Sequence, residues 1–148
     1  MRIQGGTANQ RSASDAVEIV RQELERDDRV ATAILFGSVA KGVGRRDSDL
    51  DLAVLASGDA EANALRAGLL ELSARLAAAS GRDIQVVLLD DVEPVLGRQV
   101  FSHGRTLLER DPRLTAGCLE RILIAYFDGA HHRRLMEEAL DDRLAARG

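Results

Sequence analysis

Apolar residues recur at the spacing of an amphipathic helix in four parts of the chain, namely residues 14–26, 65–81, 94–104 and from 112 onward. Ser14 and Asp15 offer oxygens that can cap the first helix. Pro94 suits the first turn of the third helix, because a proline there sacrifices no hydrogen bond. Gly129 can kink or divide the fourth. The pattern therefore predicts a chain rich in helices, with a long helical region at its end.

Shorter apolar runs predict strands over residues 30–36, 50–56 and 84–89. The first two are joined by a loop rich in glycine and basic residues, which favours a tight connection between neighbouring strands. The third run is apolar almost throughout, so we expect it to lie in the interior of a sheet. The segment RTLLE, residues 105–109, fits either an edge strand or a turn.

The order of these elements predicts a single α+β domain. The 148 residues are enough for one domain with a core, and too few for two of ordinary size. Residues 1–13 are polar, without periodicity, and are expected to form a loose tail. Residues 14–110 are expected to form the core, and residues 111–148 a C-terminal helical extension of the same domain.

Composition and charge narrow the classes of function. The formal net charge of −4, with both signs mixed along the chain, argues against a general nucleic-acid binder. A single cysteine permits no internal disulfide and fits a reducing compartment. The first residues lack the apolar centre of a signal peptide, and no apolar run is long enough to span a bilayer. We expect a cytoplasmic protein that binds neither a membrane nor nucleic acid directly.

Candidate chemistry gathers in one stretch, ILFGSVAKGVGRRDSDLDLAVL, residues 34–55. Asp49 and Asp51 stand two apart at the start of a strand, so their side chains share one face, about 7 Å apart along the backbone. Such a pair can hold Mg²⁺, which prefers oxygen ligands and is commonly bound by one or two carboxylates together with phosphates. Gly37 and Ser38, at the end of the preceding strand, allow close backbone approach and can grip a phosphate. The alternative is that the acidic pair simply faces water.

The combination of GSVAKG with SDLDLAVL after five residues resembles the signature of the DNA polymerase β-like nucleotidyltransferase superfamily, and most of all its minimal nucleotidyltransferase (MNT) branch. The resemblance covers roughly residues 15–110 and implies a small mixed sheet packed with helices, two Mg²⁺ ions and ATP as substrate. Carried over by position, Asp49 and Asp51 are the catalytic metal ligands, and the nucleotide-binding residues are Gly37, Ser38, Lys41 and Ser48. Lys41 stands where members often have arginine. With Arg45 and Arg46 it either balances triphosphate charge or belongs to a solvated loop.

The sequence departs from the family at the third carboxylate, which members supply from a later strand. Here Gln85 occupies the expected place, and Asp83 lies two residues earlier on the same strand face. Glutamine cannot take a proton or offset the charge of a metal. Either Asp83 is the third catalytic carboxylate from a displaced position, or the site has lost an acid and works poorly or only binds.

The resemblance also implies a biological setting. Many MNT proteins are antitoxins of HEPN–MNT toxin–antitoxin pairs, in which the antitoxin transfers AMP from ATP to a tyrosine of the HEPN ribonuclease. The chain has no room for a substrate domain of its own, and its C-terminal apolar stripes suit a docking surface. We expect a Mg²⁺-dependent adenylyltransferase with a HEPN partner. The alternative is an antitoxin that neutralises its partner by binding alone.

Overall fold

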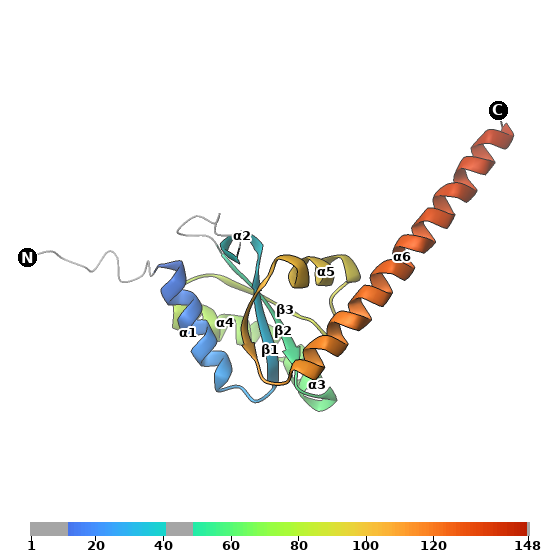
Figure 1. Cartoon of the computed structure of the whole chain (residues 1–148). Coiled ribbons are helices and arrows are strands. Elements are labelled where there is room, and N and C mark those ends of the chain that lie inside the picture. Colours follow the sequence, from blue (N-terminus) through green and yellow to red (C-terminus); the bar gives the residue numbers. More distant parts are fainter. Residues whose placement is uncertain (1–11, 41–48, 148) are drawn as a thin grey trace, which may run out of the picture.

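The structure is a computed structural model that describes residues 12–40 and 49–147. Helices and strands alternate along much of the chain, and Figure 1 shows them as a core from which the last helix projects. In order they are α1 (Ala13–Glu25), β1 (Val30–Phe36), α2 (Gly37–Ala40), β2 (Leu50–Ala56), α3 (Asp59–Ala67), α4 (Leu69–Ser80), β3 (Ile84–Leu88), α5 (Pro94–His103), β4 (Arg105–Glu109) and α6 (Pro112–Arg147). The predicted tail of residues 1–13 lies almost wholly outside the described residues.

The four strands form one mixed sheet in the order β3-β2-β1-β4. β1 runs antiparallel to both β2 and β4, whereas β2 and β3 are parallel. The predicted α+β class with a mixed sheet is therefore confirmed, and segment 105–109 is an edge strand. The interior position expected for the third strand is wrong, because β3 lies at the other edge. Its apolar side chains are covered although it has only one neighbouring strand, since Val86 and Leu88 pack on one face of the sheet and Val87 on the other.

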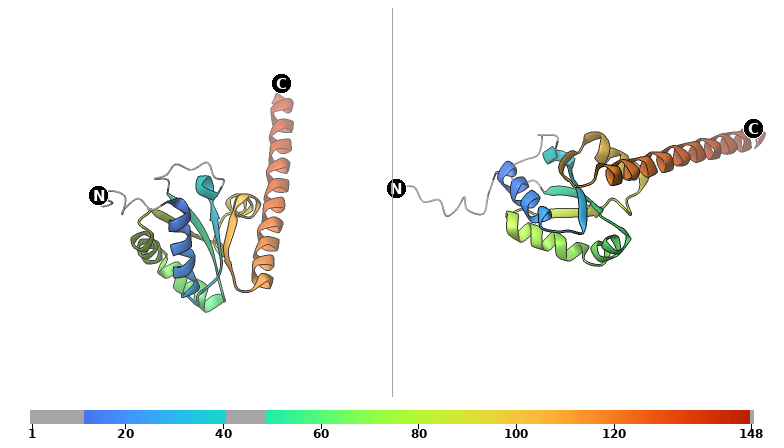
Figure 2. Two further views of the ribbon diagram at one scale, coloured as in Figure 1. Left: turned by 60° about the vertical axis from the view of Figure 1, so that its left-hand side comes forward. Right: turned by 60° about the horizontal axis from the view of Figure 1, so that its bottom comes forward.

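Helices cover both faces of the sheet (Figure 2). On one face, α1 and α4 pack over alternate residues of β1 and β2 in the larger apolar cluster. On the opposite face, Ile34, Ala53 and Leu55 pack with residues of α5 and α6 in a smaller cluster. Gly97 lets α5 and α6 approach closely, because a Cβ atom there would lie 2.8 Å from the Ile122 side chain. Each strand of the sheet centre is thus buried on both sides.

Two helix boundaries differ from the predicted ones. Ser12 rather than Ser14 or Asp15 caps α1, since its hydroxyl accepts a hydrogen bond from the Asp15 backbone N–H at 3.3 Å. The single helix predicted over 65–81 is two helices, because Gly68 ends α3 and precedes α4. Gly81 closes α4 in the left-handed conformation that favours glycine, in agreement with the predicted end.

The last helix, α6, is continuous through Gly129. Its first turns belong to the core, where Cys118 and Ile122 are buried. Beyond the core the helix projects outward (Figure 1), and from residue 132 to residue 146 every side chain is exposed. No helix in the described part of the chain is long and apolar enough to cross a membrane.

Candidate active site

The turn that follows β1 is built around Gly37. Phe36 pairs with Asp51 across the antiparallel strands, so the end of β1 lies beside the start of β2. Gly37 then adopts a φ of +79°, a conformation that L side chains rarely take, and begins the short helix α2. A Cβ atom at this position would overlap the Oδ2 atom of Asp51. Glycine is therefore required both by the backbone conformation and by the carboxylate that lies against it.

The two predicted metal ligands, Asp49 and Asp51, lie at this end of the sheet. Asp49 is exposed and Asp51 is half-buried. Burial, and secondarily the negative charge of Asp49, raises the pKa of the Asp51 carboxyl above its ordinary range. Within residues 12–40 and 49–147, neither carboxylate has a hydrogen bond or an ion pair. The site thus holds two negative charges in unfavourable proximity, and a bound cation would relieve the repulsion.

Gln85 and Asp83 occupy the neighbouring strand. Gln85 pairs with Asp51 in the parallel register of β2 and β3, so their side chains leave the same face of the sheet. The Asp83 carbonyl accepts a hydrogen bond from the Leu50 backbone N–H at 2.9 Å, which places Asp83 beside the start of β2. In the described ranges no group of three or more His, Cys, Asp or Glu side chains is arranged to hold a metal ion. The role predicted for Asp83 stays a prediction.

The oxygen donors that are present fit Mg²⁺, which is commonly held by a carboxylate pair whose remaining positions go to water and phosphate. The other predicted nucleotide contacts are not all described. The backbone of Ser38 lies in α2, but its side chain is outside the description, as are Lys41 and Ser48 with the whole of residues 41–48.

A cavity of about 340 Å³ lies next to Gly37 on the side of α5. Its lining consists of Phe36, Gly37, Leu96, Gln99 and His103. Sequence reasoning missed the three residues of α5. Their spacing of three and then four residues is the signal that places them on one helix face, but only the fold shows that this face meets Gly37.

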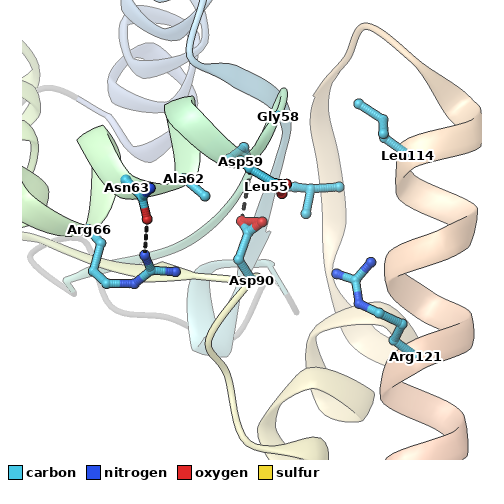
Figure 3. A pocket seen from close by; sticks show the side chains of 10 residues that line it. Leu55, Gly58, Asp59, Ala62, Asn63, Arg66, Asp90, Leu114 and Arg121 are labelled. Carbon is cyan, nitrogen blue, oxygen red and sulfur yellow. Dashed lines mark hydrogen bonds between the residues drawn. The ribbon is translucent and has the colours of Figure 1, made fainter.

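A second cavity, of about 430 Å³, lies at the opposite end of β2, between α3 and α6 (Figure 3). Its charged groups are largely matched within the protein. Asp90 accepts a hydrogen bond from the Ala56 backbone N–H at 3.0 Å, and Arg66 donates to the Asn63 side-chain oxygen at 2.9 Å. Arg66 also donates to both carboxylate oxygens of Asp91, at 2.6 and 2.7 Å, and thereby lowers the pKa of Asp91.

Comparison with known proteins agrees with the resemblance in sequence. Residues 18–113 match the model of the family described as polymerase beta, nucleotidyltransferase. Protein adenylyltransferase MntA of Shewanella oneidensis is 41% identical over 87 residues, which are 57% of this chain and 60% of that protein. The chain therefore spans about 60% of the length of the curated relative that it matches.

Two solved structures share the fold. One chain from a crystal structure of a toxin-antitoxin with AMP-PNP is 28% identical, with a TM-score of 0.64 over 82% of this chain and 95% of that chain. One chain from the complex of a tri-AMPylated Shewanella oneidensis HEPN toxin with its MNT antitoxin is 21% identical, with a TM-score of 0.59 over 84% of this chain and 98% of that chain. The second likeness concerns the fold alone.

Proposed function

The chain belongs to the polymerase beta nucleotidyltransferase family, and from this membership we propose that it is a cytoplasmic antitoxin. It transfers AMP from ATP to a tyrosine of a partner HEPN ribonuclease and thereby silences that toxin. The relatives support this activity, since one is named a protein adenylyltransferase and another is a chain of a toxin-antitoxin with AMP-PNP. Mg²⁺ is the metal that the donor set suits, and two ions are expected from the family resemblance.

The observation that carries the proposal is the close approach of Gly37 to Asp51, which together with Asp49 has no ion pair among the described residues. The backbone turn at Gly37 leaves room for Asp51 and no room for a side chain. The raised pKa of Asp51 means that its charged form is unfavourable in the free protein. Perturbed carboxylates in such a position are more typical of functional sites than of structural ones.

In this mechanism Asp49 and Asp51 hold Mg²⁺, which when bound offsets the negative charge of the triphosphate. The phenol oxygen of the acceptor tyrosine attacks the α-phosphorus, the bond from that phosphorus to the β-phosphate oxygen breaks, and pyrophosphate leaves. Gln85 orients groups at the site through its amide but cannot accept the phenol proton. That proton passes to Asp83, as the sequence predicts, or to water.

The projecting helix α6 supports a protein acceptor. An apolar stripe, with residues three or four apart, lines an open cavity of about 540 Å³ on its outer side. Ile124 and Phe127 in this stripe are 55% and 59% exposed. Apolar helix faces of this kind dock partners in grooves. The partner proposed for this face is the HEPN protein.

Labelling of the partner tests the proposal. The full chain is incubated with ATP labelled at the α-phosphate, Mg²⁺ and the proposed HEPN partner, and we expect the label on a tyrosine of the partner. Asp49→Asn and Asp51→Asn should each lower labelling by at least about a hundredfold, because removal of a group that stabilises transition-state charge has effects of this size. An unlabelled partner that is nevertheless neutralised would contradict the transferase and favour binding alone.

Gln85 favours that second candidate, an antitoxin that works by binding. An amide in place of the third carboxylate removes one negative charge that would bind the metal ion. It also leaves no group at that position that can accept a proton. Gln85→Asp distinguishes the two, because a carboxylate beside Asp51 should raise the labelling rate of a working transferase severalfold. The same variant should leave the affinity of a binding-only antitoxin for its partner unchanged.

A further inference from the structure

One face of α5 is directed toward the cavity beside Gly37. Leu96, Gln99 and His103 share this face, because they are three and then four residues apart. Two other residues of α5 are engaged elsewhere. Val100 is buried in the core, and Arg98 lies over the Tyr126 ring, 4.7 Å from its centroid. The three cavity residues are thus presented to α2 by the way the rest of α5 packs.

The lining of this cavity combines apolar walls with two polar side chains. Phe36 and Leu96 are partly buried and belong to the smaller apolar cluster. The side chains of Gln99 and His103 are exposed at its mouth, and among the described residues they have no hydrogen-bond partner. A volume of about 340 Å³ lies within the range of small-molecule sites, of roughly 300–1,000 Å³. The chemistry suits a flat ring that stacks on an aromatic or apolar wall and forms hydrogen bonds at its edge.

The position of the cavity connects it to the carboxylates. Gly37 is part of its wall, and the Asp51 carboxylate lies against the same residue. A ligand in the cavity would therefore be separated from the Asp51 carboxylate by Gly37 alone. A nucleotide meets both conditions, with its phosphates at the carboxylates and its base in the cavity.

We propose that the cavity between α2 and α5 takes the adenine base of ATP and that Gln99 determines the preference for adenine. This rests on the proposed function, which names ATP as the substrate but assigns no residues to its base. The amide of glutamine offers one donor and one acceptor at a fixed spacing, and so pairs with N7 and the N6 amino group of adenine through two hydrogen bonds. The phenol ring of an acceptor tyrosine has a single hydroxyl and would use only half of this pairing.

A change of one atom in Gln99 tests the assignment. In Gln99→Glu the side chain only accepts hydrogen bonds, so it loses the donor for adenine N7. It gains two donors from guanine, whose N1–H and N2 amino groups can both donate to a carboxylate. Gln22→Glu is the matched control, because Gln22 is exposed on α1 and makes the same change of charge away from the cavity.

The readout is the affinity of the full chain for ATP and for GTP, each with Mg²⁺, by competition against a fluorescent ATP analogue. Gln99→Glu should move the ratio of the two dissociation constants toward GTP by about tenfold or more, since a bidentate contact with a base discriminates by about this much. Gln22→Glu should leave the ratio unchanged. The thermal unfolding midpoint of each variant shows that it is folded.

An equal loss of both nucleotides in Gln99→Glu, or no change in either, would overturn the assignment. So would a fall in tyrosine labelling with an unchanged ratio of the dissociation constants for ATP and GTP. That result would indicate that the cavity binds the acceptor tyrosine instead of the base. A wild-type chain that binds ATP and transfers nothing would sink the proposed function while the change of ratio still supported the role of Gln99. A chain that binds neither nucleotide would overturn both.

Discussion

Carboxylates at the two ends of strand β2 differ in their partners and in the direction of their pKa shifts. Where β2 starts, Asp51 lies against Gly37 and beside Asp49, and its pKa is raised. Where β2 ends, both carboxylate oxygens of Asp91 accept hydrogen bonds from the Arg66 guanidinium, and the pKa of Asp91 is lowered. Asp27, which precedes the start of β1 at this same end of the sheet, is only 8% exposed. It likewise accepts hydrogen bonds from Arg29 and Arg75, and its pKa is lowered.

We interpret this difference as one between charges that support the fold and charges that bind a ligand. A carboxylate with arginine partners stabilises the folded chain as it stands. A half-buried carboxylate next to a second one costs stability until a cation arrives. We therefore assign the proposed active site to the end of β2 where the carboxylates cost stability. The following substitutions test this assignment.

The largest effect on stability is expected at Gly37. Gly37→Ala forces an L residue into positive φ and places its Cβ against Asp51, so unfolding should become about 1–3 kcal/mol easier. Nucleotide affinity should fall with it. Urea unfolding and ATP binding measure the two effects.

Gly117→Ala is the matched control. An added Cβ there meets nothing within 4 Å, and alanine is the better helix former, so this variant should be as stable as the wild type or more so. Equal stability of Gly37→Ala and Gly117→Ala would show that the turn at Gly37 tolerates a side chain.

A smaller loss is expected at the opposite end of the sheet. Asp27→Asn removes charged hydrogen bonds from Arg29 and Arg75 and should cost about 1–2 kcal/mol at pH 7. Because the folded-state pKa of Asp27 is lowered, its contribution is present above the ordinary carboxyl pKa and is lost as the pH falls below about 4. The difference between variant and wild type in urea unfolding should therefore shrink in acid. Transferase activity should be unchanged. A loss of activity in a folded variant would contradict a purely structural role for Asp27.

The smallest effect has the opposite sign. Asp51→Asn removes an unfavourable charge, so without metal the variant should be more stable than the wild type at pH 7, by about 0.5 kcal/mol. The raised folded-state pKa means that the cost of Asp51 disappears as the pH falls through that value toward the ordinary one, and the gap should close below about pH 4.

Mg²⁺ sharpens the same experiment. It should raise the thermal midpoint of the wild type, because it binds only the folded site, and should have little effect on Asp51→Asn. Stability of Asp51→Asn below that of the wild type in the absence of metal would place Asp51 among the supporting carboxylates.

Local patterns were enough to predict most elements of the fold. The apolar runs at 30–36 and 50–56 correspond to β1 and β2 as the structure has them. The position of β3 in the sheet was harder to predict. Its side chains are apolar because packing covers both of its faces, and this gives no information on whether a second strand lies beside it. Gly68 divided a predicted helix, since a leucine pattern can continue through a break that a single residue causes.

The candidate site was predictable only in part. Asp49, Asp51 and Gly37 were recognisable because they are close in sequence and have a characteristic spacing. The contact between Gly37 and Asp51 depends on the register of two strands, which the spacing does not determine. Gln99 depends on how α5 packs against the sheet, and no nearby residue marks it as part of the site.

The overhang of α6 has a consequence for how the chain behaves alone. Most of the stability of a helix in a protein comes from packing of its apolar face, and residues 132–146 receive no cover from the core. Amide protons there should exchange with solvent long before those of the sheet, and slow down once another molecule lies along the helix. Amide exchange over residues 132–146 would therefore report whether a partner is bound along α6.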